Sequence, residues 1–294
     1  MRFLPLVFTA LALVGCANSP RQVSESDSTT LAFAPRDDQR VETAPQVAML
    51  RPDQPVVPRG SLAGRTIRVS KASDIRLGPK EVVLTFDDGP VPGKTDAILR
   101  ALDQFGVKAT FLMVGQMANA YPATARKVAA AGHTIGTHTQ NHKNLRIVGP
   151  MVAEAQIRDG RESVANALRP GGYRPAPFFR FPYLADTAAL RGGLAAQGIV
   201  VIDVDIDSRD YYASGSEALR ARAVAAVEKR GSGVILFHDL HARTATMLPQ
   251  LLSDLKARGY KVVHLVPARA DVELVATSAK PTPPRIDAAS PERG

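Results

Sequence analysis

Two polar clusters in this sequence combine side chains that can bind a metal ion and activate water. Asp87 and Asp88 follow a short apolar run, and His138 and His142 stand four residues apart. One carboxylate with two imidazoles is a ligand set for Zn²⁺ in hydrolases and for Fe(II) in oxygenases. A second carboxylate beside the metal could act as a general base. Taken alone, the two aspartates could equally belong to a solvated turn, because Asp-Gly-Pro favours turns.

The spacing of the two histidines is also informative. If the segment from His138 to His142 is helical, both rings lie on one face of the helix. His133 precedes this pair, and we expect it to be structural and to lie in a buried strand.

Three further polar clusters follow apolar runs. Arg180 could cap a sheet, or it could hold a carboxylate in place. Four aspartates, some of them expected to be turn residues, crowd the end of another run: Asp203, Asp205, Asp207 and Asp210. His238 ends a third run, and a lone histidine there is usually structural. Beside four other polar clusters it becomes a candidate general acid.

Short apolar runs and amphipathic stretches alternate along the chain and must position these clusters. Apolar runs predict buried strands at 82–86, 110–114, 178–179, 200–206, 234–237 and 262–263. Apolar residues with helical spacing predict helices at 95–105, 123–131, 151–168, 188–197, 217–229 and 244–258. Glycines follow three of these helices immediately before a strand, as left-handed caps do.

This alternation predicts an α/β fold with a mostly parallel sheet. About seven repeats favour a (β/α) barrel in a single catalytic domain over an open, doubly wound sheet. No glycine-rich loop follows the first strand, which argues against a dinucleotide or phosphate site. In parallel barrels the active site lies at the carboxyl ends of the strands, and all five clusters fall there.

Composition limits the classes of protein that the chain can belong to. Its 294 residues are 45% hydrophobic and 22% charged, which excludes collagen-like, coiled-coil and wholly disordered proteins. The single cysteine excludes an intrachain disulfide. A net charge of +9 suits an anionic partner such as a cell-wall polymer or a membrane surface. No nucleic-acid-binding motif accompanies this charge, so we expect no nucleic-acid partner.

The amino terminus predicts a lipoprotein signal peptide over residues 1–15. A basic start precedes the apolar run 3–14, which ends in the sequence Leu13-Val14-Gly15-Cys16 and resembles a bacterial lipobox. We expect acyl chains on Cys16 to anchor the protein to a membrane, with an ordinary signal peptide as the alternative. Because Ala17 follows instead of Asp, we expect the outer membrane, facing the periplasm, in a Gram-negative cell.

The remaining segments differ in composition. Residues 16–64 are rich in polar residues and proline, which predicts a flexible tether. Residues 65–266 contain the alternating pattern and form the predicted catalytic domain. Residues 267–294 form a proline-rich tail.

Taken in order, the five clusters resemble the motifs of the polysaccharide deacetylase family (carbohydrate esterase family 4, the NodB homology domain). The resemblance covers roughly residues 65–266. It implies a distorted parallel barrel and a divalent metal, usually Zn²⁺, with Co²⁺ or Ni²⁺ as alternatives. It also implies an enzyme that removes acetyl groups from N-acetylated sugars.

The resemblance assigns roles to individual residues. It implies that Asp87 is the general base and His238 the general acid, and that the metal ligands are Asp88, His138 and His142. Arg180 would orient Asp87, the backbone N–H of Tyr183 would face the oxyanion, and Asp210 would be the partner of His238. The wall of the substrate site would include Pro182, Tyr211 and Leu236.

The chain departs from the family at one position. Asp207 and Asp210 match the Asp-x-x-Asp-Trp motif, but Tyr211 stands where the family prefers Trp. Because the chain contains no Trp, sugar stacking would fall to other aromatic residues: Tyr183, Tyr211, Tyr212, Phe178 or Phe179.

The leading hypothesis is a zinc-dependent deacetylase acting on N-acetylglucosamine residues of peptidoglycan, because an anchored, basic domain would face the cell wall. A second hypothesis keeps the site and changes the substrate to an exopolysaccharide, a chitooligosaccharide or O-acetylated xylan. A third is a wall-binding lipoprotein without catalytic activity. The complete set of acid, base and ligands counts against the third.

Overall fold

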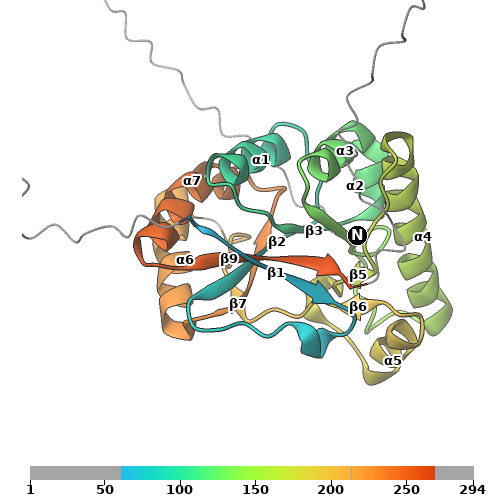
Figure 1. Ribbon diagram of the computed structural model, residues 1–294. Helices are drawn as coiled ribbons and strands as arrows, with labels where there is room; N and C mark the ends of the chain where they lie inside the picture. Colours follow the sequence, from blue (N-terminus) through green and yellow to red (C-terminus); the bar gives the residue numbers. More distant parts are fainter. Residues whose placement is uncertain (1–60, 213, 269–294) are drawn as a thin grey trace, which may run out of the picture. The chain divides into compact units, whose positions relative to one another are not determined.

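Strands and helices alternate through residues 61–212 and 214–268, which are the residues that this computed structural model describes (Figure 1). The strands are β1 (Ala63–Val69), β2 (Glu81–Asp87), β3 (Thr110–Met113), β4 (Thr134–Thr137), β5 (Phe178–Phe179), β6 (Val200–Val201), β7 (Ile206–Asp207), β8 (Gly233–His238) and β9 (Lys261–Pro267). The helices are α1 (Lys94–Gln104), α2 (Gly115–Ala120), α3 (Pro122–Ala130), α4 (Pro150–Leu168), α5 (Ala188–Ala196), α6 (Ser216–Arg230) and α7 (Ala242–Ala257). The predicted signal peptide, Cys16, and nearly all of the tether and tail lie outside the described residues.

The strands pair in parallel around a barrel. From β2 the ladder runs through β3, β4 and β5 to β6 on one side, and through β8 to β7 on the other. Among the described residues no ladder joins β6 to β7, so the barrel is open at that point. Figure 1 shows the helices around the outside of these strands. The predicted α/β class and distorted parallel barrel are therefore confirmed.

The segment 200–206 is not one strand, as the sequence predicts, but two. Ile202 N–H donates to the Phe179 carbonyl of β5, whereas Asp205 N–H donates to the Val234 carbonyl of β8. The chain therefore leaves one edge of the open barrel and joins the other. Residue type does not reveal this crossing, because Val200, Val201 and Ile206 are all apolar and all buried.

Strands β1 and β9 close the amino-terminal end of the barrel. They pair with each other from Thr66 to Val69, and β9 also pairs with the first two residues of β2 (Figure 1). Ile67, Val263 and Leu265 pack in the same cluster as the barrel interior. The apolar pattern predicted only the second and third residues of β9 and missed β1, which begins at Ala63. The buried strand expected at His133 is β4, which begins one residue later.

Strand alternation divides the core into two layers. Inward side chains fill the barrel: Val83, Leu112, Phe178, Val200 and Val234. On β4 the inward position is Gly136, where a Cβ would lie 2.7 Å from Leu112 Cδ1 and 2.6 Å from the Phe178 carbonyl oxygen. A side chain there would collide with the packed interior, so this position requires glycine.

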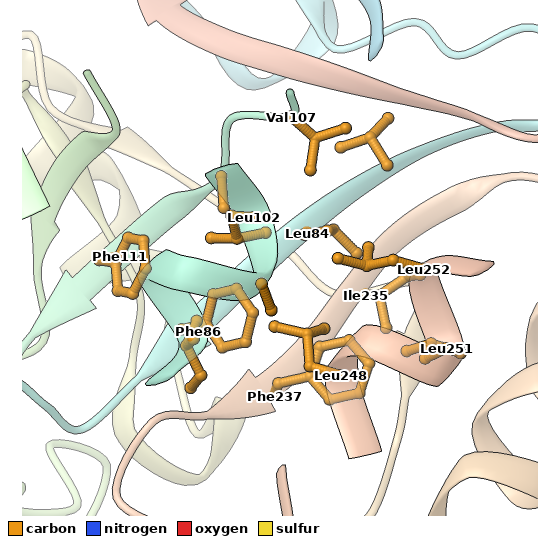
Figure 2. Close-up of a cluster of buried hydrophobic side chains, with 14 of the residues drawn as sticks. Leu84, Phe86, Leu102, Val107, Phe111, Ile235, Phe237, Leu248, Leu251 and Leu252 are labelled. Atoms are coloured by element: carbon orange, nitrogen blue, oxygen red, sulfur yellow. The ribbon is translucent and has the colours of Figure 1, made fainter. Parts of the chain in front are cut away.

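Outward side chains bury the helices against the strands. Phe86 stacks between Phe111 and Phe237, with ring centroids 5.1 and 5.7 Å apart. Figure 2 shows these rings with Leu102 of α1 and the leucines of α7 packed against them. Each such side chain, when fully buried, contributes about 1.5–3 kcal/mol. This layer fixes the strands whose ends carry the polar clusters.

No helix within residues 61–212 and 214–268 combines the length and apolar character needed to cross a bilayer.

Candidate active site

A pocket of about 450 Å³ opens at the carboxyl ends of the strands. Its lining residues come from segments far apart in the sequence: Asp87, Asp88, His138, His142, Phe181, Tyr183, Leu184, Asp207, Tyr211, Leu236, His238 and His241. Four of the five polar clusters contribute their own polar side chains to the pocket. Arg180 does not line it, but its neighbours in the sequence, Phe181 and Tyr183, do. The barrel topology therefore brings all five sequence clusters to one site.

Asp88, His138 and His142 converge at one side of the pocket. Asp88 Oδ1 lies 3.5 Å from His138 Nε2 and 3.3 Å from His142 Nε2. The same Asp88 oxygen is buried and has no hydrogen-bond partner among the described residues. A buried carboxylate oxygen without a partner is costly unless a cation compensates it.

His138 is held in the tautomer that binds a metal. Its Nδ1 lies 2.7 Å from the Arg180 carbonyl oxygen, and because a carbonyl only accepts, Nδ1 must carry the hydrogen. Nε2 then presents its lone pair toward Asp88. Burial lowers the pKa of His138 to about 3, so the ring is neutral, as a ligand must be. The three side chains fit a divalent cation such as Zn²⁺.

The segment carrying both histidines is not helical. His138 follows β4 directly, and Thr139 and His142 have φ angles of 66° and 57°. Thr139 Oγ1 accepts the His142 N–H at 3.0 Å and fixes this tight turn. The two imidazoles therefore meet through a turn, and the alternative of a shared helical face is excluded.

Asp87 is buried beneath the pocket and paired with Arg180. Arg180 Nη1 donates to Asp87 Oδ1 at 2.8 Å and to Thr85 Oγ1 at 2.7 Å. Its Nε donates to the Ile202 carbonyl at 2.9 Å, and Nη2 to the Asp203 carbonyl at 3.3 Å. Arg180 is 1% exposed, so its guanidinium forms a floor between the apolar interior and the pocket.

The environment of Asp87 suits a base. Burial raises the pKa of its carboxyl group, although the positive charge and hydrogen bond of Arg180 oppose this shift. A raised pKa makes the carboxylate a stronger proton acceptor than an exposed aspartate.

His238 is the last residue of β8, the strand paired with β2, and it forms a pair with Asp210, which follows β7. Asp210 Oδ1 lies 2.6 Å from His238 Nδ1, and Oδ2 accepts the His238 backbone N–H at 2.8 Å. Thr244 Oγ1 donates to the same Oδ2 at 2.6 Å. Burial alone would lower the pKa of His238, but the hydrogen bond and charge of Asp210 outweigh it and raise the pKa to about 9. His238 is therefore protonated near neutral pH and can donate a proton.

The predicted substrate wall is only partly exposed to the pocket. Tyr211 and Leu236 line it, whereas Pro182 is buried and does not. The Tyr211 hydroxyl donates to Asp207 Oδ2 at 2.9 Å, and burial together with this contact raises its pKa to about 12. Tyr183 and Tyr212 are exposed and could contact a sugar. The suggestion that Phe178 or Phe179 stacks on sugar is wrong, because both are fully buried in the core.

Several residues of the site were missed by sequence reasoning. Thr85 and Thr244 complete the hydrogen bonds of Arg180 and Asp210. Thr95 Oγ1 donates at 2.6 Å to Asp239, whose buried carboxylate packs against Gly89 in the turn after Asp88. The only sequence signal for Thr85 is a polar residue at an inward position of an apolar strand.

Comparisons with known proteins match the chain to polysaccharide deacetylases. A sequence profile described as polysaccharide deacetylase matches residues 74–202. The chain is 34% identical over 197 residues to a chitin deacetylase of Colletotrichum lindemuthianum, a match that spans 63% of this chain and 77% of that protein.

Solved structures show the same similarity. A Bdellovibrio bacteriovorus peptidoglycan deacetylase is 37% identical with a TM-score of 0.61, and the match covers 71% of this chain and 57% of that one. A family 4 carbohydrate esterase from Streptomyces lividans, in complex with acetate, is 33% identical with a TM-score of 0.55 and is matched over 62% of this chain and 91% of its own. This chain belongs to the polysaccharide deacetylase family.

Proposed function

We propose that this protein is a zinc-dependent deacetylase that removes N-acetyl groups from N-acetylglucosamine residues of peptidoglycan. One observation carries the proposal. A buried carboxylate, Asp87, and a protonated histidine, His238, line the same pocket as the ligand set Asp88, His138 and His142. Amide hydrolysis needs a base for the attacking water, an acid for the departing amine, and a stabiliser for the oxyanion.

Each residue has a distinct task in this proposal. A zinc ion, when bound, supplies Lewis acidity that favours deprotonation of water and polarises the acetyl carbonyl. Asp87, oriented by Arg180, accepts the proton of the attacking water. His238, oriented by Asp210, donates its Nε2 proton to the amine nitrogen as the carbon–nitrogen bond breaks. Tyr183 lines the pocket, and its backbone N–H would stabilise the oxyanion.

Two observations support a polymeric sugar as the substrate. The pocket is bordered by the exposed aromatic rings of Tyr183 and Tyr211, and the ring of Tyr212 contacts Tyr211 at a tilt, with centroids 4.8 Å apart. Sugar rings pack on such surfaces. The similarity to a Bdellovibrio peptidoglycan deacetylase favours peptidoglycan. Chitooligosaccharide is the second candidate, because the chain is 34% identical to a chitin deacetylase.

The place of action is part of the same proposal. The lipobox-like sequence ending at Cys16 supports a lipid-anchored protein of the cell envelope, in the outer membrane of a Gram-negative cell. The net charge of +9 suits an anionic wall polymer. Metabolic labelling with a palmitate analogue tests the anchor, and labelling should disappear in Cys16→Ser.

Mass spectrometry of muropeptides tests the activity. Cells with the protein should contain muropeptides lighter by one acetyl group on glucosamine, and cells without it, or with Asp87→Asn, should not. The purified protein should release acetate from N-acetylglucosamine oligomers, and a chelator should stop the release until Zn²⁺ is restored. Acetate release from chitooligosaccharides with unchanged muropeptides would instead favour the second candidate.

A further inference from the structure

We propose that His238 and His241, with Asp210 behind His238, form a second and weaker site for a zinc-like cation, and that a cation there inhibits the enzyme. The inhibitory part rests on the proposed function, whereas the binding part does not. This second cation site is separate from the Asp88, His138 and His142 set and uses none of its ligands.

The fold brings the second set of ligands together locally. His238 is the last residue of β8, and His241 is the residue that precedes α7. Their ring centroids lie 5.9 Å apart with the rings nearly perpendicular. Possible ligand atoms of Asp210, His238 and His241 all lie within 4.8 Å of one another. Ligand atoms about 2.0–2.1 Å from a tetrahedral zinc ion lie about 3.4 Å apart, so small side-chain rotations would bring these atoms onto one cation.

Hydrogen bonding decides which atoms are free. Asp210 already accepts hydrogen bonds from His238 Nδ1, the His238 backbone and Thr244. It therefore acts behind His238, as carboxylates do behind metal-binding histidines, and leaves His238 Nε2 for the cation. The His241 ring makes no hydrogen bond with the described residues, so its nitrogens are available. Two imidazoles would hold the cation, and both line the pocket.

The second cation site should be the weaker of the two. The first site offers two imidazoles and a buried carboxylate oxygen that has no hydrogen-bond partner within residues 61–212 and 214–268. The second offers two imidazoles, one of which must lose a proton before it can bind. Imidazole ligands favour Zn²⁺, Ni²⁺ or Cu²⁺ over Mg²⁺ and Ca²⁺. Excess zinc should therefore occupy the second site, and excess magnesium should not.

Occupation of the second site would block proton donation. A cation on His238 Nε2 occupies the atom that delivers the proton to the departing amine. The enzyme would then be active with one bound zinc ion and inhibited by the next. His238 and His241 would thus set an upper limit on the zinc concentration at which the enzyme is active.

Equilibrium dialysis of the untagged, full-length protein against Zn²⁺ tests the binding part without any substrate. The wild type should bind two equivalents, the second more weakly. His241→Gln removes one of the two imidazole ligands and should weaken the second equivalent by at least about 10–100-fold, the loss caused by removing only a hydrogen-bond partner behind a metal ligand. His241→Asp replaces the imidazole by a carboxylate ligand and should still bind the second equivalent of zinc. His264→Gln removes an imidazole outside the pocket and is the matched control, which should still bind both.

Acetate release from N-acetylglucosamine oligomers, measured across the same zinc concentrations, tests the inhibitory part. The wild type should be active with one equivalent of zinc and should lose activity as the second binds. His241→Gln should keep its own maximal rate up to a zinc concentration at least tenfold higher. Excess Mg²⁺ should not inhibit either protein. A wild type that binds one equivalent, or a second equivalent that persists in His241→Gln, would overturn the site. A second equivalent that leaves the rate unchanged would overturn the inhibition. Failure of the proposed function would differ from both, because no acetate would be released even at one equivalent.

Discussion

Asp87 and His238 occupy the same register position at the ends of the paired parallel strands β2 and β8. Residues at one register position on neighbouring strands point to the same side of the sheet, here into the pocket. The proposed base and the proposed acid are therefore positioned by backbone hydrogen bonds of the barrel and not by a flexible loop. Phe86 and Phe237, one residue earlier, point outward and stack on each other.

The two adjacent aspartates should respond differently to substitution. Asp87→Asn should keep stoichiometric zinc but lose about 10²–10⁴-fold in kcat, because it removes a base and no metal ligand. Asp88→Ala should lose zinc and activity together. Metal analysis after dialysis, run beside acetate release, measures both. A rate near that of the wild type in Asp87→Asn would show that another group accepts the proton.

The role of His238 should depend on the leaving group. An amine must be protonated as it departs, so His238→Ala should cost about 10²–10⁴-fold on N-acetylglucosamine oligomers. An activated aryl acetate expels a leaving group that needs no proton, so the same variant should lose far less there. Asp87→Asn is the control and should be impaired on both substrates. Equal losses on the two substrates in His238→Ala would mean that this histidine serves the fold or the metal instead.

The decrease in activity at alkaline pH should follow the deprotonation of His238, which is paired with Asp210. The pKa of His238 is raised to about 9, so the acid form predominates at neutral pH and is lost as the pH rises through 9. Asp210→Asn removes the charge that favours the imidazolium and should move this decrease to lower pH. Because the folded-state pKa is raised, this pair should stabilise the fold fully below about pH 6.5, with the contribution lost as the pH rises through 9. An NMR titration of His238 in metal-free protein measures the pKa without turnover. An unchanged pKa in Asp210→Asn would contradict the assignment.

The buried pair of Asp87 and Arg180 should show strong coupling in stability. Arg180→Met leaves a buried carboxylate without its partner and should lower the free energy of unfolding by about 3–5 kcal/mol. The double variant Arg180→Met, Asp87→Leu should recover part of this loss but no activity. Lys127→Met breaks an exposed pair with Asp96 and should cost at most about 1 kcal/mol. Urea unfolding measures all three, and a double variant that loses more stability than Arg180→Met, instead of recovering part of the loss, would argue against the pairing.

A glycine on α4 should be needed for the turn that carries both histidines. A Cβ on Gly160 would lie 2.5 Å from the Thr139 carbonyl oxygen and 2.7 Å from Gln140 N. Gly160→Ala should therefore push this turn away, lowering both stability and zinc affinity. In α5, a Cβ on Gly192 would meet nothing within 4 Å, so Gly192→Ala should stabilise by about 0.5–1 kcal/mol with zinc affinity unchanged. If Gly160→Ala binds zinc as tightly as the wild type, the helix does not position the turn.

Much of the fold follows from local patterns. Alternating apolar strands and amphipathic helices predict the parallel barrel, because each pattern lies within a window of about ten residues. Phe178–Phe179 forms β5 as predicted, and β2 and β8 extend their predicted strands by one residue at each end. The position of every polar cluster after such a strand also predicts one shared site, since parallel strands end on the same side.

The tertiary structure alone decided how those clusters act together. Segment 200–206 became two strands because its halves pair with β5 and β8, and the His138–His142 segment became a turn because Thr139 caps it. Neither choice is visible in residue type. The floor built by Arg180 depends on acceptors from Thr85, Ile202 and Asp203. Sequence determines which residues end the strands. Long-range strand pairing determines which of them meet, because hydrogen bonds between distant segments have no counterpart in local periodicity.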